Sequence, residues 1–114
     1  MSLKRSAIMA KSIMQTEKEC YICRKKADLI GWKGELYSRG LHRHHVMFGS
    51  ADRKISEETG LWVWLCAEYH HVYGPESAHG NREVAEMLMR DGQEAFEKIH
   101  GHEEWMRLFG RSYL

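Results

Sequence analysis

All three cysteines of the chain fit a single metal site. Cys20 and Cys23 form a Cys-x2-Cys pair, Cys66 closes an apolar run, and His70 follows four residues later. Three thiolates and one imidazole make up a tetrahedral donor set of the kind that holds structural Zn²⁺. An odd number of cysteines also argues against a secreted disulfide scaffold and favours metal binding in the cytosol. The alternative is three unrelated cysteines, one of them buried beside a strand.

The histidines form a second constellation. Six of the eight lie between residues 42 and 79, and four of these make the adjacent pairs His44-His45 and His70-His71. Neighbouring residues point to opposite faces of a strand and diverge by roughly 100° on a helix. His70 can therefore face the zinc while His71 faces His44, and His79 can return to the same place after the Gly-Pro turn.

A metal-dependent phosphodiesterase needs two functions from such residues. One set of side chains holds a divalent cation that neutralises charge on the phosphate. A separate neutral imidazole accepts a proton from the attacking water. His44 with His71 or His79 suits the first role, and His45 suits the second. The alternative is that these are surface or core histidines of a zinc-binding module.

Cations near this constellation suggest an anionic partner. The net charge of +1 conceals +7 over residues 1–56, from twelve Lys/Arg and five Asp/Glu, and −6 over residues 57–114, from five and eleven. A basic half can lie along a phosphate backbone while an acidic half faces away. Arg43, Arg53 and Lys54 flank the proposed centre and are predicted to contact DNA phosphates. Ordinary solvated surface is the alternative for both observations.

A small α+β domain is needed to position these residues. With 43% hydrophobic and 11% aromatic residues, the 114-residue chain is globular, and no apolar run is long enough for a membrane span. Residues 1–16 read as a polar leader with helical spacing at Ile8, Met9, Ile13 and Met14, and residues 17–114 as one zinc-containing domain. The elements expected are a turn-rich segment over 17–34, a strand running into a loop over 35–48, a loop or short helix over 49–60, a strand over 61–65, and helices over 82–99 and 102–109.

The C-terminal elements carry recognisable boundary signals. Asn81 is a good N-cap for the long helix, and Gly110 is placed to end the last one. Within the long helix one apolar stripe is predicted to face the core, although a central glycine weakens it; its members are Ala85, Leu88, Phe96 and Ile99. Tyr113-Leu114 is expected to dock on the core. Trp62 and Trp64 are expected to pack under the C-terminal helix, with base stacking by one of them as the alternative.

Taken in order, these motifs resemble a known family. The series Cys-x2-Cys, His44-His45-x2-Phe48-Gly49, Leu65-Cys66, His70-His71 and His79-Gly80-Asn81 looks like the phage-encoded HNH-type nucleases. It is most similar to the branch of recombination-enhancing, RecA-dependent nucleases, and the closing residues 109–114 look like the tail of that branch. Asp52 stands in the segment where this branch shows Asn-Arg-Lys, so the middle Asn of the HNH signature has no clear equivalent.

The resemblance implies a fold, an activity and partners. It implies a ββα-metal (His-Me finger) core, a divalent ion such as Mg²⁺, cleavage of DNA, a recombinase partner and a place in the bacterial cytoplasm. By resemblance, His45 matches the general base and His44 the metal ligand just before it. Two other classes of protein use the same residues: a non-catalytic zinc module that binds DNA or a protein, and a structural phage protein with a degenerate nuclease fold.

Overall fold

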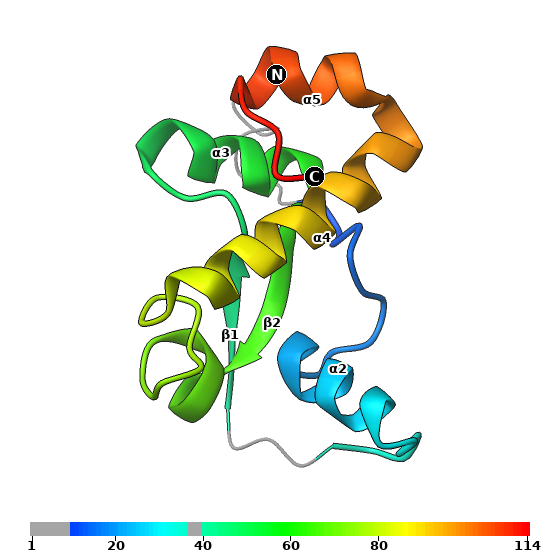
Figure 1. Cartoon of the computed structure of the whole chain (residues 1–114), viewed down its shortest axis with the longest axis vertical. Helices are drawn as coiled ribbons and strands as arrows, with labels where there is room; N and C mark the ends of the chain where they lie inside the picture. Colours follow the sequence, from blue (N-terminus) through cyan, green and yellow to red (C-terminus); the bar gives the residue numbers. More distant parts are fainter. Residues whose placement is uncertain (1–9, 37–39) are drawn as a thin grey trace.

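Two antiparallel strands form the centre of the molecule. The structure is a computed structural model that describes residues 10–36 and 40–114. Strand β1 (Leu41–His45) pairs with β2 (Trp62–Cys66), and α4 (Arg82–His100) crosses one face of the pair (Figure 1). The remaining elements are α2 (Tyr21–Leu29), α3 (Ser50–Thr59), α5 (His102–Phe109) and the π-helical turn η1 (Ala67–His71). The predicted α+β class is confirmed, and no helix in the described ranges is long and apolar enough to span a membrane.

The strand register sorts the side chains of the hairpin onto two faces. His44 lies opposite Val63, and Arg43 lies opposite Trp64. Because side chains alternate along a strand, His44 shares a face with the buried Val63 and Leu65, while Arg43 shares the other face with the tryptophans. The core is built on the first face, where the apolar strand residues pack with Leu88 and Phe96 of α4.

Helix α4 begins and packs largely as the sequence predicts. The Asn81 side chain accepts hydrogen bonds from the backbone N–H groups of Glu83 and Val84, at 2.9 and 3.2 Å. Ala85, Leu88 and Phe96 are buried, but the prediction for Ile99 is wrong, because this residue is 58% exposed. Beyond Phe96 the helix is covered by α5 instead of the sheet: the Phe96 and Trp105 rings lie 5.6 Å apart, and Trp105 is fully buried.

Gly92, which weakens the helical pattern, has a packing role. A Cβ atom at this position would lie 3.2 Å from Leu61 Cδ2 and 3.3 Å from Val46 Cγ1. A Cβ atom would press on these two side chains, so glycine eases the close approach of the helix to the end of the sheet, at the cost of a lower helix propensity. The position of α4 against the strands therefore depends on this residue.

The C-terminal tail returns to the core. Gly110 ends α5 in the left-handed conformation, as predicted. The Tyr113 N–H then donates a 2.6 Å hydrogen bond to the buried Gln93 side chain, and the Tyr113 ring packs against the core. Leu114 is 60% exposed, so the docking predicted for the last two residues holds for Tyr113 alone.

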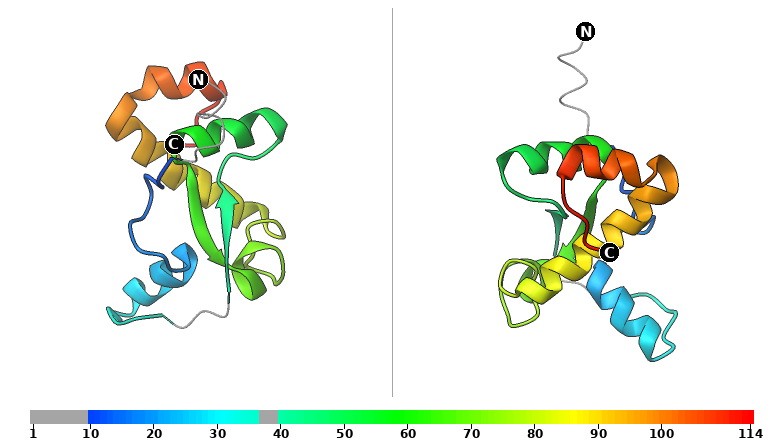
Figure 2. Two further views of the ribbon diagram at one scale, coloured as in Figure 1. Left: turned by 180° about the vertical axis from the view of Figure 1, so that it is seen from behind. Right: turned by 45° about the horizontal axis from the view of Figure 1, so that its top comes forward.

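The start of the described chain runs beside β2. Residues 1–9 of the predicted leader lie outside the described ranges, and residues 10–16 form no helix. Instead, the Ser12 hydroxyl donates to Trp62 O at 2.6 Å, and the Gln15 side chain accepts from Trp64 N at 2.7 Å. Figure 2 shows this segment (blue) alongside the strand from behind. The tryptophans therefore pack beside the N-terminal segment, and the prediction that they lie under the C-terminal helix is wrong.

Two other segments are more helical than the sequence suggests. The turn-rich segment expected over 17–34 contains α2, whose first turn is formed by the Cys-x2-Cys pair itself. For residues 49–60, the short-helix alternative is the observed one, since α3 spans Ser50–Thr59. This helix occupies the connection between β1 and β2.

Candidate metal centres and the adjoining cleft

The four predicted zinc ligands converge. We call Cys20, Cys23, Cys66 and His70 the four-ligand cluster; their ligand atoms all lie within 4.8 Å of one another. His70 Nδ1 is 3.4 Å from two of the sulfurs and 3.1 Å from the third, and Cys23 Sγ is 3.9 Å from Cys66 Sγ. Tetrahedral Zn²⁺ with bonds of about 2.0–2.3 Å requires separations of about 3.6–3.8 Å. The cluster is close enough to hold a metal ion, and its donors suit structural zinc.

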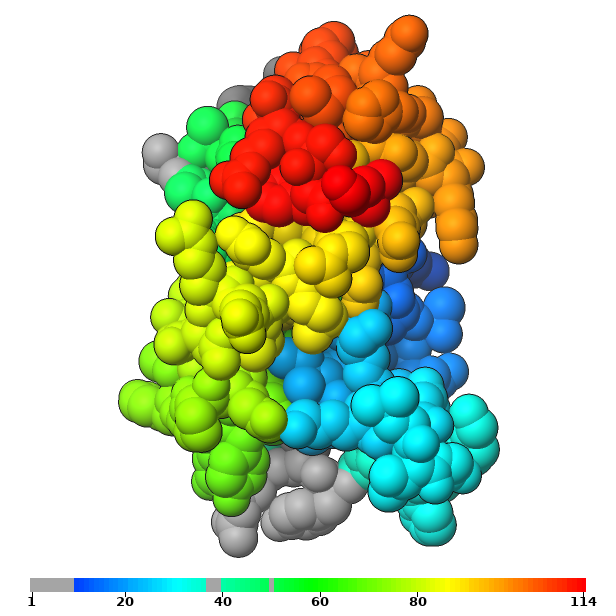
Figure 3. Space-filling view, viewed as in Figure 1, coloured from blue at the N-terminus to red at the C-terminus, as the bar shows by residue number. Residues whose placement is uncertain are grey.

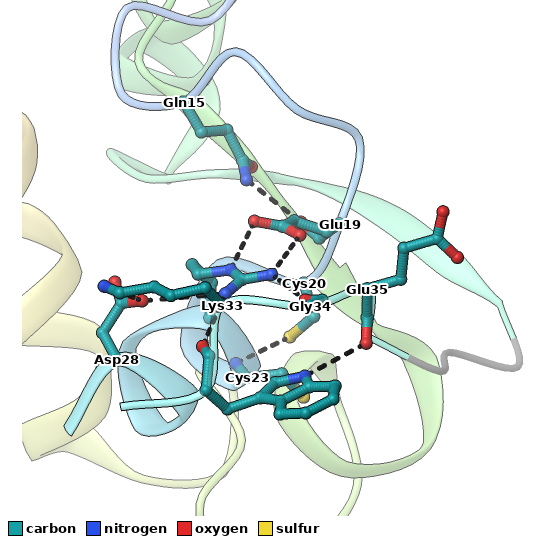
Figure 4. Close-up of polar contacts among 10 residues, drawn as sticks. Gln15, Glu19, Cys20, Cys23, Asp28, Lys33, Gly34 and Glu35 are labelled. Atoms are coloured by element: carbon teal, nitrogen blue, oxygen red, sulfur yellow. Dashed lines mark hydrogen bonds and ion pairs between the residues drawn. The ribbon is translucent and has the colours of Figure 1, made fainter. Parts of the chain in front are cut away.

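Local structure holds the cysteine pair in place. Cys20 is the N-cap of α2, and its sulfur accepts a 3.4 Å hydrogen bond from Cys23 N (Figure 4). Arg24 then makes two hydrogen bonds to the Glu19 carboxylate, at 2.8 and 3.1 Å, and a third to Gly34 O at 2.7 Å. These contacts fasten the chain on both sides of α2 around the thiols.

The electrostatics of the thiols favour a bound cation. The hydrogen bond between Cys20 and Cys23 lowers the pKa of the Cys20 thiol to about 5 and raises that of Cys23. Burial raises the pKa of Cys66. Without a metal, negative charge on one sulfur therefore opposes ionisation of the others, whereas a divalent cation stabilises all three thiolates together.

A second cluster lies on the other side of η1. We call His44, His71 and His79 the three-histidine cluster; their ligand atoms also lie within 4.8 Å of one another. The three ring centroids are 4.9–5.4 Å apart, and each pair meets edge to face. Both candidates that the sequence left open for the third ligand, His71 and His79, therefore join His44.

His44 is the most unusual member of this cluster. Its side chain is 1% exposed, and neither of its ring nitrogens has a hydrogen-bond partner among the described residues. Burial, followed by repulsion from His79 and His71, lowers the pKa of His44 to about 3. Burial likewise lowers the pKa of His71 to about 4. Both rings are thus kept neutral, the form in which imidazole binds metals.

The loop after η1 brings His79 back to the cluster. The backbone N–H of His79 donates to His71 O at 3.0 Å. Inside the loop, the buried Ser77 hydroxyl lies 3.1 Å from Val72 O and accepts from Gly80 N at 3.0 Å. A Cβ at Gly80 would lie 2.6 Å from this hydroxyl, so the tight turn requires glycine there.

His42 is a neighbour that the sequence argument missed. Its Nδ1 lies 3.0 Å from Nδ1 of His71, so one of the two nitrogens donates to the other. This contact fixes the ring of His71 and leaves its Nε2 for the cluster. The period-two spacing of His42 and His44 on one strand face is a signal that could have identified it.

The three-histidine cluster opens into a cleft of about 410 Å³. We call this the histidine cleft; its walls also include His45, Arg43 and Arg53. His45 Nε2 lies 3.1 Å from the Glu57 carboxylate of α3. Burial lowers the pKa of His45, and the nearby arginines lower it further, while Glu57 opposes them. No spacing in the sequence pointed to Glu57.

The predicted phosphate-binding residues separate into two groups. Arg43 and Arg53 line the cleft, whereas Lys54 is exposed on α3 and does not. Asp52, the residue in the segment of the missing Asn, also lies outside the cleft lining, in the first turn of α3. The Arg43 guanidinium lies 4.5 Å from the ring centre of Trp62 and 5.3 Å from that of Trp64, so the tryptophans hold it in place.

Comparison with known proteins gives no assignment. No protein-family model matches the chain, and neither a curated protein nor a solved structure matches it.

Proposed function

We propose that this chain is a metal-dependent nuclease of the HNH type that hydrolyses phosphodiester bonds in DNA. The observation that carries this proposal is the meeting of His44, His71 and His79 at one cleft that also contains a fourth histidine, His45. The order of β1, β2 and the long helix α4, with α3 between the strands, is compatible with the proposed ββα-metal core and supports the proposal. DNA as substrate, a phage or prophage origin and a recombinase partner rest on the family resemblance.

The residues of the three-histidine cluster fit a metal ion. A buried imidazole with two unsatisfied nitrogens costs about 1–3 kcal/mol, and coordination by one nitrogen removes part of that cost. Three imidazoles favour Zn²⁺ or another late transition-metal ion over Mg²⁺, which prefers oxygen ligands. When bound, such an ion neutralises charge that develops on the phosphate, and three protein ligands leave coordination positions open for a substrate.

His45 is the proposed general base, and its protonation and its contact with Glu57 support this role. Its lowered pKa leaves the ring neutral at pH 7, able to take a proton. With Nε2–H donated to Glu57, Nδ1 is the nitrogen that accepts a proton from water. The water oxygen then bonds to phosphorus as one P–O ester bond breaks, and the proton stays on His45 until it passes to the leaving oxygen or to solvent.

The arginines of the cleft are suited to bind the phosphate. A guanidinium matches two phosphate oxygens at once, and the stacking of Arg43 on two tryptophans reduces the entropy lost when it binds. Arg53 lines the same cleft and, like Arg43, is close enough to His45 to lower the pKa of that residue. The two positive charges beside His45 are therefore proposed to bind a phosphodiester close to the general base.

A plasmid-nicking assay tests this function. The protein is incubated with supercoiled DNA and Mg²⁺, Mn²⁺, Co²⁺ or Zn²⁺ in turn, and the wild type is compared with His45→Ala. We expect nicking by the wild type and a loss of about 10²- to 10⁴-fold in the variant. His102→Ala, which removes an exposed histidine of α5, is the matched control and should nick normally. If the wild type is inert with every metal while its fold and zinc are intact, the chain is not a nuclease.

A further inference from the structure

A second cleft adjoins the histidine cleft. Its volume is also about 410 Å³, and the two share Phe48 and His79 in their walls. It lies between the start of α4 and the C-terminal tail, and Figure 3 shows the tail (red) lying directly on α4 (yellow). A chain-like substrate that occupies the histidine cleft can therefore continue into this second one.

The second cleft is lined by arginine side chains, although it lies in the acidic half of the chain. Residues 57–114 contain five Lys/Arg against eleven Asp/Glu, yet two of the five, Arg82 and Arg111, line this cleft. Its one carboxylate, Glu86, lies 3.3 Å from Arg82 Nε in a solvent-exposed ion pair. The second cleft thus extends the positive charge of Arg43 and Arg53 beyond His79.

Two hydrogen bonds to buried side chains hold the backbone at and just after Arg111. Its carbonyl accepts a 2.8 Å hydrogen bond from the fully buried Trp105 indole, and two residues later Tyr113 N donates to the buried Gln93. The guanidinium lies 4.7 Å from the ring centre of Tyr113. A cation on a tail fixed in this way is preorganised, which lowers the entropic cost of binding an anion.

We propose that the second cleft binds the DNA backbone on one side of the cleaved bond, with Arg82 and Arg111 on flanking phosphates. The inference rests on the proposed nuclease function and adds to it the path of the substrate. Each strand of a duplex carries a phosphate about every 3.4 Å along the helix axis, so a phosphodiester in the histidine cleft carries neighbours into the adjoining space. Guanidinium groups suit these neighbours because they bind phosphate oxygens in pairs.

The proposed role of the second cleft can be tested by measuring DNA binding under conditions in which no DNA is cleaved. The zinc-loaded His45→Ala protein is titrated with a labelled duplex over a range of salt concentrations, without added divalent metal. Adding Arg82→Ala and Arg111→Ala should weaken binding and reduce the slope of log K against log salt by about 2, one for each lost phosphate contact. Arg90→Ala removes the same charge from α4 outside the second cleft and should leave the slope unchanged. Glu86→Gln removes a negative charge from the second cleft and should therefore increase the affinity for DNA.

The possible outcomes separate this proposal from the nuclease proposal. If the double variant and Arg90→Ala show equal slopes and affinities, the second cleft does not bind DNA, even where the wild type nicks plasmid. If the double variant lowers the slope in a protein that never nicks DNA, the DNA path is supported and only the nuclease assignment fails. Weaker binding by Glu86→Gln would also count against the path.

Discussion

The four-ligand cluster and the three-histidine cluster share one short element, yet they are built for different chemistry. His70 and His71 are neighbours in η1; the first faces three sulfurs, and the second faces two imidazoles beside an open cleft. Four protein donors, three of them thiols, leave no position for a substrate. Three neutral donors at the wall of a cleft leave at least one coordination position open to a substrate. Completeness of the ligand set is therefore what distinguishes a site that holds the fold together from one that can take part in a reaction.

The proximity of the two clusters also links folding to function. The four-ligand cluster fixes η1 to α2 and to the end of β2, and η1 in turn carries His71. If each cluster binds the metal proposed for it, loss of the ion from the four-ligand cluster should disturb both clusters, whereas loss of the ion from the three-histidine cluster should disturb only that one.

The largest effect is expected from Cys23→Ser. A structural Zn²⁺ contributes about 10–16 kcal/mol of apparent binding energy, which matches or exceeds the total stability of about 5–15 kcal/mol usual for a small domain. The variant should lose its zinc and unfold, as shown by metal analysis and circular dichroism, and strong chelation of the wild type should reproduce this. A variant that melts like the wild type without metal would show that the cluster is dispensable.

A smaller and more local effect is expected from His79→Ala. His79 is exposed, so its removal leaves no cavity in the core. The protein should keep its fold and one equivalent of zinc but lose the metal proposed for the three-histidine cluster, with affinity reduced by more than about 100-fold. Isothermal titration of the zinc-loaded protein with Zn²⁺ or Co²⁺ measures this, and His102→Ala is the matched control. Unchanged stoichiometry in His79→Ala would remove this residue from the ligand set.

The sequence predicts the ligand residues of the two clusters to different extents. The three cysteines of the four-ligand cluster follow from their spacing and from a use for each of them. The sequence indicates His70 less directly, because Tyr69 stands where a fourth cysteine would complete a second Cys-x2-Cys pair. The third ligand of the other cluster stayed open between His71 and His79, because its answer depends on a loop folded by the Ser77 hydroxyl and the close approach at Gly80. Hydrogen bonds within a loop produce no repeating pattern of residues from which they could be predicted.

Long-range packing explains the remaining errors. Ile99 fits the apolar period of α4 but lies past the sheet, where α5 covers a different side of the helix. Trp62 and Trp64 pack beside a segment that precedes them by about fifty residues, through contacts that no local pattern encodes. The two strands and the two C-terminal helices could thus be predicted, whereas helix α2 and the approach of Glu57 to His45 from α3 could not.

Glu57 should matter to the rate and little to the fold. Glu57→Ala removes the partner that orients His45, and we expect about a tenfold lower kcat, a fraction of the general-base contribution, with KM nearly unchanged. Glu57→Gln should restore most of the rate. Because the Glu57 charge raises the pKa of His45, its removal should also move the acid limb of the pH–rate profile to lower pH. Glu58→Ala is the neighbouring control, and equal rates for both alanine variants would remove Glu57 from the site.

The smallest effect is expected at the outer carboxylate of the four-ligand cluster. Glu76 Oε1 lies 4.0 Å from His70 Nε2, beyond hydrogen-bond reach, and is held by Lys26 in an ion pair whose two side chains are more than half exposed. Exposed pairs of this kind contribute little to stability. Glu76→Gln should therefore keep its zinc content and its melting midpoint, both measured beside the wild type. If the variant instead released zinc, zinc binding by His70 would depend on the Glu76 carboxylate, much as the proposed role of His45 depends on Glu57. The number of protein ligands would then no longer be enough to explain the difference between the two clusters.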